Sequence, residues 1–262
     1  MSALSNDQLR VTLLQSDLFW EDKQANLSNF DTKLQALNEP TDLVILPEMF
    51  TTGFSMRPAV LAEPMTGPTI SWLTNKAREL NAVITGSFIC QEKEQYYNRL
   101  IWMQPDGNFF TYDKKHLFSL AKEGDFYTAG QKRLLVTLKG WKILPLICYD
   151  LRFPVWSRNT ENYDLLLFVA NWPKPRIQAW SSLLTARAIE NQCYTIGVNR
   201  VGEDGNGMAH SGASVVIDYS GTLIYQVHQT EAVFTTTLSL APQNHFRNKL
   251  RFLADRDKFQ IL

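Results

Sequence analysis

Apolar residues recur along the chain at two spacings, one typical of buried strands and the other of helices packed on one face. The spacing predicts strands at 9–15, 42–46, 82–90, 99–104, 109–112, 133–138, 142–148, 164–170, 193–199, 213–218, 223–227 and 232–238. It predicts helices at 22–37, at 68–80, just after Phe153 and at about 176–191. Strands that alternate with helices indicate an α/β domain, and hairpin-like strand pairs favour mixed sheets.

The chain shows no repeat, linker or low-complexity tract, and 262 residues fit one α/β domain. We therefore expect a single domain over 1–262, with a polar and basic C-terminal arm from about residue 240.

The charge balance narrows the range of partners. There are 26 basic and 26 acidic residues and no basic block, which argues against nucleic acid or an acidic membrane surface as a partner. No apolar run is long enough to span a bilayer, and residues 1–10 lack the apolar region of a signal peptide. We expect a cytoplasmic protein that acts on a small molecule.

Three cysteines, Cys90, Cys148 and Cys193, are too far apart and too few to suggest a disulfide framework. No Cys/His cluster has the spacing of zinc ligands, so no metal is expected. Cys90 and Cys193 lie within apolar strand patterns and are interpreted as core residues.

Cys148 differs because it ends the apolar run 143–147 and is followed directly by Tyr149 and Asp150. A strand that turns sharply into a helix exposes such a side chain and directs free backbone N–H groups, such as that of Tyr149, at a developing oxyanion. The helix N-terminus and a nearby lysine would lower the thiol pKa from its usual value of about 8.5. From the local sequence alone, a small buried hydrophobe is an equally good interpretation.

Glu48 and Lys114 also follow predicted strands. A carboxylate placed just past the buried run 42–46 needs a partner, and burial would make Glu48 a usable general base. An ammonium at a strand end can stabilise an oxyanion. Taken singly, Glu48 is more simply interpreted as an exposed loop acid, and Lys114 as a member of a solvated Lys114–Lys115 pair.

Together these segments resemble the nitrilase superfamily of carbon–nitrogen hydrolases. Residues 46–50 (LPEMF) resemble its glutamate motif, 112–118 (YDKKHLF) its lysine motif and 147–153 (ICYDLRF) its cysteine motif. The three motifs follow one another in the same order as in the family. The match to the lysine motif assigns the catalytic lysine role to Lys114 and not to Lys115. Val155 departs from the acidic residue that many members carry there.

The resemblance implies a four-layer α-β-β-α sandwich, a homodimer and no cofactor. It also implies a second glutamate between the lysine and cysteine motifs, for which Glu123 is the candidate and Asp125 the alternative. Segments 170–173 (ANWP), 186–191 (ARAIEN), 198–202 (VNRVG) and 210–212 (HSG) resemble the bacterial omega-amidase branch. That branch implies a short dicarboxylic acid monoamide, such as 2-oxoglutaramate or 2-oxosuccinamate, as substrate.

The implied reaction forms a thioester on Cys148, with Glu48 moving protons and Lys114 holding the oxyanion with the Tyr149 N–H. The far carboxylate of such a substrate needs a cation, and Arg176 is interpreted either as that cation or as a surface residue. Phe118, Phe153, Asn171 and Trp172 are expected at the pocket, although such aromatic residues are often plain core.

Three alternatives remain open from the sequence. One is a nitrile or N-carbamoyl-amine hydrolase on the same three residues. Another is a Cys-His pair that uses one of the chain's four histidines, which are His116, His210, His228 and His245. The third is a non-catalytic binding protein that keeps the fold. The absence of a G-x-S-x-G motif argues against a serine hydrolase.

Overall fold

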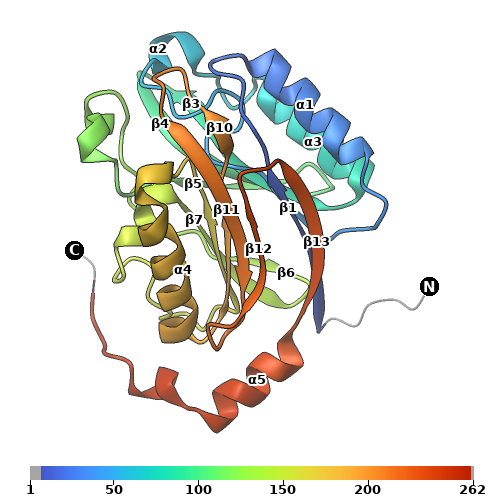
Figure 1. Cartoon of the computed structure of the whole chain (residues 1–262), viewed down its shortest axis with the longest axis vertical. Coiled ribbons are helices and arrows are strands. Elements are labelled where there is room, and N and C mark those ends of the chain that lie inside the picture. The colour runs from blue at the N-terminus through green and yellow to red at the C-terminus, as the bar shows by residue number, and fades with distance from the viewer. Residues whose placement is uncertain (1–6, 261–262) are drawn as a thin grey trace.

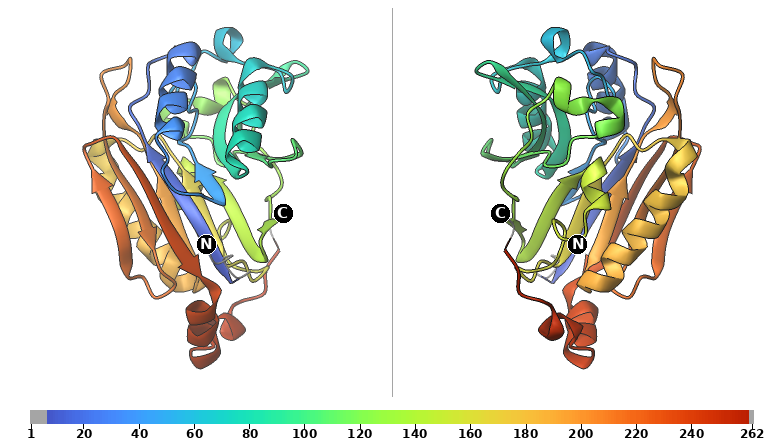
Figure 2. Two further views of the ribbon diagram at one scale, coloured as in Figure 1. Left: turned by 90° about the vertical axis from the view of Figure 1, so that its right-hand side faces the viewer. Right: turned by 90° about the vertical axis from the view of Figure 1, so that its left-hand side faces the viewer.

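The computed structural model describes residues 7–260, in which two β-sheets pack face to face between outer helices (Figures 1 and 2). The first sheet has the order β13 (Ala232–Ser239), β1 (Gln8–Gln15), β2 (Leu43–Ile45), β3 (Val83–Glu92), β4 (Gln95–Met103) and β5 (Phe109–Asp113). The second has the order β10 (Val201–Glu203), β11 (Ala209–Ile217), β9 (Tyr194–Val198), β8 (Leu165–Val169), β7 (Trp141–Ile147) and β6 (Val136–Leu138), with β12 (Leu223–His228) also paired to β11.

The α-helices are α1 (Lys23–Gln35), α2 (Pro58–Leu61), α3 (Pro68–Leu80), α4 (Ile177–Asn191) and α5 (Leu240–Lys249). Five 3₁₀ turns, η1 to η5, span Ser119–Ala121, Glu123–Asp125, Cys148–Arg152, Lys174–Arg176 and Phe252–Asp255. Figure 2 shows α1 and α3 outside one sheet and α4 outside the other. The expected α-β-β-α sandwich is therefore confirmed.

Two clusters of buried apolar side chains hold the layers together. The larger joins Leu13 and Trp102 of the first sheet to Leu146 and Val198 of the second and to Trp180 of α4. The other cluster packs α1 and α3 onto the outer face of the first sheet. Burial of apolar area at about 25 cal/mol per Å² makes these interfaces the main stabilising contribution.

Local signals set the helix ends. The Asp22 carboxylate accepts the N–H of Ala25 at 3.0 Å and caps α1, while Pro68 begins α3 with the φ that a first turn needs. Asn81 ends α3 in the left-handed conformation, with φ 48°.

The strand directions bring several chain reversals to one region. β1, β2 and β3 run parallel to one another, as do β7, β8 and β9. The carboxyl ends of neighbouring parallel strands lie at the same sheet edge, which is where α/β proteins place their ligand sites. Residues that follow β2, β5, β7 and β8 can therefore meet at the end of the sandwich.

The expected helix after Phe153 is wrong. Residues 148–152 form the 3₁₀ turn η3, and 154–157 form turns rather than a helix. Long-range contacts fix this segment instead: the Phe153 ring stacks on His116, with ring centroids 3.6 Å apart, and the Trp156 indole N–H donates to the Tyr112 hydroxyl. These tertiary contacts outweigh the helical spacing of the apolar residues.

The segment expected to be an arm contains α5 and η5. α5 packs on the body through Gln243, which is buried, and through Arg247, which donates to the Asp164 carboxylate and to the carbonyls of Tyr163 and Gln192. Figure 1 shows α5 at the end of the sandwich opposite α2.

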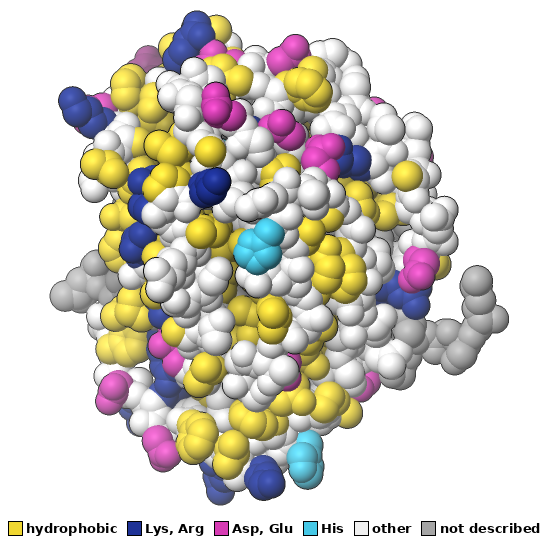
Figure 3. Space-filling model, viewed as in Figure 1, with side chains coloured by type: hydrophobic (Ala, Val, Ile, Leu, Met, Phe, Trp, Pro, Cys, Tyr) yellow, Lys and Arg dark blue, Asp and Glu magenta, His cyan; other side chains and the backbone are white. Residues whose placement is uncertain are grey.

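The surface carries no dominant charge on the face drawn in Figure 3, where acidic and basic side chains both appear and neither covers the face. Within residues 7–260, no helix is both long enough and apolar enough to cross a membrane.

Candidate active site

Cys148 lies where β7 ends and the chain enters η3. Its backbone has φ 42°, a left-handed conformation that costs an ordinary residue free energy and is concentrated at functional sites. Asp150 holds this turn: its carboxylate accepts the N–H of Ile147 at 3.1 Å, the hydroxyl of Tyr112 at 2.7 Å and the N–H of His116 at 3.0 Å. One buried carboxylate therefore ties the cysteine turn to the strand and loop that carry Lys114.

Glu48 follows β2 and is completely buried. Its Oε1 accepts the side-chain amide of Asn98 at 2.8 Å and the Lys114 ammonium at 3.0 Å. Its Oε2 accepts the backbone N–H of Asn171 at 2.8 Å, and its carbonyl oxygen accepts the Asn171 side-chain amide. The strand ends of both sheets thus converge on one carboxylate.

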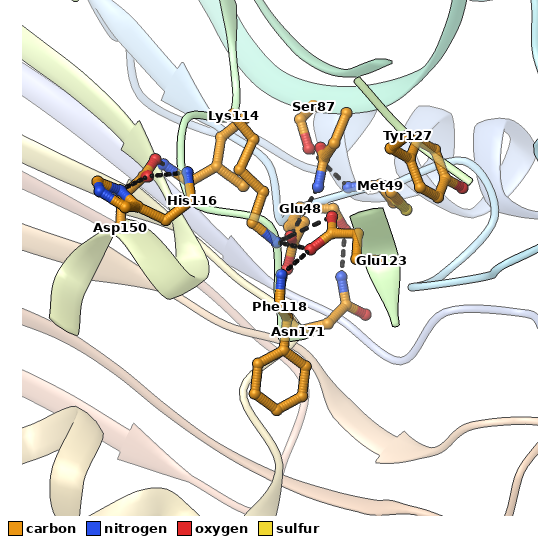
Figure 4. Close-up of polar contacts among 12 residues, drawn as sticks. Glu48, Met49, Ser87, Lys114, His116, Phe118, Glu123, Tyr127, Asp150 and Asn171 are labelled. Carbon is orange, nitrogen blue, oxygen red and sulfur yellow. Dashed lines mark hydrogen bonds and ion pairs between the residues drawn. The ribbon is translucent and has the colours of Figure 1, made fainter. Parts of the chain in front are cut away.

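Lys114 follows β5 and lies between two carboxylates, as Figure 4 shows. Besides Glu48, its ammonium contacts both oxygens of Glu123 at 3.1 and 3.0 Å. Glu123 in turn accepts the backbone N–H of Phe118 at 2.6 Å. Lys114 and Glu123 are almost fully buried, so each depends on the other for charge compensation.

These contacts shift the protonation equilibria. Burial alone disfavours the Lys114 ammonium, but the charges of Glu123 and Glu48 prevail and raise its pKa above the ordinary value. Burial also raises the pKa of the Glu123 carboxyl, and the Lys114 charge opposes that rise. Lys114 therefore stays protonated at neutral pH and is a fixed positive charge in the site.

The expected lowering of the Cys148 thiol pKa is wrong. Burial raises this pKa well above its ordinary value, the charge of Glu48 raises it further, and Lys114 offsets only part of the rise. η3 is also a single short turn, so it supplies little of the dipole that the expected helix would have supplied. Cys148 therefore rests as a thiol, and a nucleophilic role for it would require a base that removes its proton.

A cavity of about 390 Å³ opens beside these groups. Its wall includes Glu48, Lys114 and Cys148 together with all but one of the residues expected at the pocket, namely Phe118, Tyr149, Asn171, Trp172 and Arg176. Segments that are far apart in the sequence, such as 20–21, 54–57 and 204–210, complete the wall. The volume suits a small substrate.

Two guanidinium groups at the cavity stack on aromatic walls. Arg176 lies over the Phe118 ring at 5.3 Å, and Arg152 lies over the Trp172 ring at 4.9 Å. Neither forms an ion pair with a carboxylate of residues 7–260, whereas Arg57, also at the cavity, contacts Glu21 at 2.6 Å. The structure therefore favours the cavity interpretation of Arg176 over the surface one.

Other expected residues lie elsewhere. Asp125 is exposed, and Glu123 is the acid that reaches Lys114. The Lys115 ammonium bonds Gln131 at 3.1 Å and lies over the Trp156 ring. Phe153 is not part of the cavity wall, because its ring is stacked on His116.

The histidines offer little support for a Cys-His pair. His116 Nδ1 lies 2.8 Å from the Asp150 carboxylate, so its ring is already engaged. His228 and His245 do not line the cavity, and burial, followed by the nearby Arg200 charge, lowers the His210 pKa to about 4. Glu48 is the base best placed for Cys148.

Sequence reasoning did not identify Asn98, Arg152 or His210 as site residues. Asn98 precedes the strand predicted at 99–104, and its one available signal is an amide beside buried hydrophobic positions. His210 was considered as the base of a Cys-His pair and as part of the segment 210–212, and Arg152 only as part of the cysteine motif. Within residues 7–260, no group of three or more His, Cys, Asp or Glu side chains is arranged to hold a metal ion.

Comparison with known proteins gives a consistent result. Residues 10–246 match the carbon-nitrogen hydrolase family. The chain is 46% identical over 255 residues to the omega-amidase YafV of Escherichia coli K12, covering 97% of this chain and 98% of that protein. It is 30% identical over 250 residues to a 2-oxoglutaramate amidase of Bacillus subtilis, covering 94% and 96%.

Solved structures are similar as well. XC1258 from Xanthomonas campestris, described as a CN-hydrolase superfamily protein with an arsenic adduct in its active site, superposes with a TM-score of 0.95 at 44% identity and covers 97% of this chain and 99% of that one. An amidase from Nesterenkonia shares the fold, with a TM-score of 0.82 at 23% identity over 96% of this chain and 98% of that one.

Proposed function

The chain belongs to the carbon-nitrogen hydrolase family, and from that membership we propose that it is an omega-amidase, which hydrolyses the terminal amide of a small dicarboxylic acid monoamide to the dicarboxylate and ammonia. The single observation that carries the proposal is the convergence of Glu48, Lys114 and Cys148 at one cavity. The 46% identity to omega-amidase YafV over nearly the whole chain supports the choice of substrate class.

In the proposed first step, Glu48 takes the thiol proton as the sulfur of Cys148 attacks the amide carbon. The carbonyl electrons move onto oxygen, where the Lys114 ammonium and the Tyr149 N–H stabilise the negative charge. Glu123 does not line the cavity, so its role is to position Lys114 rather than to contact substrate.

The intermediate then collapses to a thioester. The C–N bond breaks, and protonated Glu48 gives its proton to the leaving nitrogen, which departs as ammonia. Water takes the vacated position, Glu48 removes its proton, and the thioester is hydrolysed to the carboxylate with the thiol regenerated.

The far carboxylate of the substrate is proposed to bind Arg176, whose guanidinium is held over Phe118 and has no acidic partner within the described residues. Arg152, over Trp172, adds a second positive charge to the same cavity. A monoamide without that carboxylate would lose these contacts.

The decisive assay measures ammonia release from 2-oxoglutaramate, 2-oxosuccinamate, glutamine and asparagine, with a nitrile and an N-carbamoyl amine as the competing substrate classes. We expect the two 2-oxo amides to be the best substrates. Faster turnover of the nitrile or the carbamoyl compound would overturn the proposal.

A matched pair of variants tests the carboxylate contact. Arg176→Ala should raise KM for 2-oxoglutaramate about 10- to 100-fold with a smaller effect on kcat, because a charge-assisted contact to the bound substrate is lost. Arg158→Ala, whose guanidinium bonds Glu190 and Asn191 outside the cavity, is the control. An unchanged KM in Arg176→Ala would show that another group binds the carboxylate.

We further propose a cytoplasmic homodimer. The three cysteines are all free, which suits a reducing compartment, and Ile189 leaves an apolar side chain exposed on α4 for a partner subunit. Analytical ultracentrifugation would test the dimer, and a monomer at micromolar concentration would contradict it.

A further inference from the structure

The two oxygens of the Glu48 carboxylate are not equivalent. A carboxylate oxygen has two lone-pair sites, and both sites of Oε1 are occupied, by the Asn98 amide at 2.8 Å and the Lys114 ammonium at 3.0 Å. Oε2 receives one protein donor, the Asn171 N–H at 2.8 Å. Oε2 is therefore the oxygen that has a lone pair free to accept a proton.

The orientation of the Asn98 side-chain amide toward Glu48 costs free energy of folding. Asn98 is 1% exposed, and its amide oxygen has no hydrogen-bond partner within the described residues. An unpartnered buried oxygen is destabilising, so the amide is not oriented to satisfy its own groups. The orientation instead follows from Glu48, whose Oε1 accepts the Asn98 side-chain amide at 2.8 Å.

The main chain of Asn98 also contacts Lys114. Its carbonyl oxygen accepts the backbone N–H of Lys114 at 3.0 Å, while its side chain donates to Glu48. Because Asn98 lies within β4, paired with Ile89 of β3, the sheet holds both contacts rigid. One residue thus sets the separation of the carboxylate and the ammonium.

We propose that Asn98 is a positioning residue that occupies Oε1 of Glu48 and so directs proton transfer from Cys148 to Oε2. This inference rests on the proposed role of Glu48 as base. In the step, the S–H bond of Cys148 breaks and an O–H bond forms at Oε2, while the sulfur electron pair attacks the amide carbon. Asn98 and Lys114 keep their contacts to Oε1, so the acid formed at Oε2 remains next to the leaving nitrogen.

The test is Asn98→Leu, which keeps the size of the side chain and removes its donor. Loss of a donor destabilises the carboxylate form of Glu48 relative to its protonated form, so the acid limb of kcat/KM for 2-oxoglutaramate should move up by about one pH unit. We expect kcat at neutral pH to fall about 10- to 100-fold and KM to stay within about twofold.

Asn159→Leu is the matched control. Asn159 is a fully buried amide outside the cavity, and it bonds the Tyr163 carbonyl at 2.9 Å. The Asn159→Leu substitution should lower the thermal stability without moving the acid limb of kcat/KM. If Asn98→Leu loses activity equally at every pH, with the acid limb unmoved, Asn98 is merely structural and the proposal is overturned.

Two further variants keep the test decisive. Should Asn98→Leu not fold, Asn98→Ser leaves a smaller side chain whose hydroxyl is too short to reach Oε1, and the same shift of the acid limb is expected. Glu48→Gln tests the premise separately: full activity in that variant would refute Glu48 as base, whereas an inactive Glu48→Gln with an unshifted Asn98 variant refutes only the inference.

Discussion

The two ends of the second sheet each hold a cysteine, half-buried Cys148 and fully buried Cys193, and the contrast between them explains what makes a site. Cys148 follows the carboxyl end of β7, whereas Cys193 precedes the amino end of β9. Burial raises the pKa of both thiols, that of Cys193 to about 12. Burial alone therefore does not distinguish a nucleophile from a core residue.

The difference lies in the neighbouring groups. Cys193 lies 3.8 Å from the Thr195 hydroxyl. Arg247, a cation that acts on this thiol, is engaged by Asp164 and two carbonyls. Cys148 lies beside a glutamate and a lysine that both line the cavity. A proton acceptor within reach, and space for a substrate, convert an inert thiol into a reactive one.

The largest expected effect comes from removing each thiol in turn. Cys148→Ala should reduce ammonia release by about 10⁴-fold or more while circular dichroism and melting temperature stay close to those of the unmodified protein. Cys193→Ala should keep full activity and lose about 1–2 kcal/mol of unfolding free energy, because a buried sulfur is replaced by a small void. Normal activity of Cys148→Ala would show that Cys148 is not the nucleophile.

A second comparison separates the neighbouring lysines. Lys114→Met should lower kcat about 10²- to 10³-fold because the oxyanion loses its fixed charge. Its stability should also fall, because Glu48 and Glu123 lose their buried counter-charge. Lys115→Met, which removes only a contact to Gln131 and the Trp156 ring, should change kcat by less than about twofold. Equal losses in both variants would contradict the assignment.

The smallest effect concerns stability as a function of pH. His210 has a pKa lowered to about 4, so an unfolded chain, with a histidine pKa of about 6.5, binds more protons between these values. The stabilisation from neutral His210 is therefore complete above about pH 6.5 and is lost as the pH falls toward 4, by on the order of 3 kcal/mol.

Replacing His210 by Phe should flatten this part of the stability curve in urea titrations at pH 4 to 7. His245→Phe is the control, because His245 is exposed on α5 at the other end of the sandwich. If the unfolding free energy of the unmodified protein and of His210→Phe changed equally with pH, the His210 ring would not be held neutral by the cavity wall.

The sequence pattern by itself determined most of the strands and helices, whereas the four-layer sandwich was implied by the family resemblance. The spacing of apolar residues predicted β1, β8, α1, α3 and α4 within a few residues. A helix or strand buried on one face has apolar residues at regular intervals, and a strand buried on both faces has a continuous apolar run. The prediction from spacing failed just after Phe153, where stacking on His116 and bonding to Tyr112 override the apolar spacing. It also missed β10, which is three residues long and leaves almost no pattern.

The candidate catalytic residues were likewise named from three short motifs, because each motif places a chemically distinctive side chain at a strand end. Only the tertiary structure decided that Glu48 and Lys114 meet 3.0 Å apart, that Asn98 and Asn171 orient the carboxylate, and that Arg176 turns to the cavity. It also reversed the expected shift of the Cys148 pKa. Desolvation and distances between charges depend on segments far apart in the chain, and no local pattern records them.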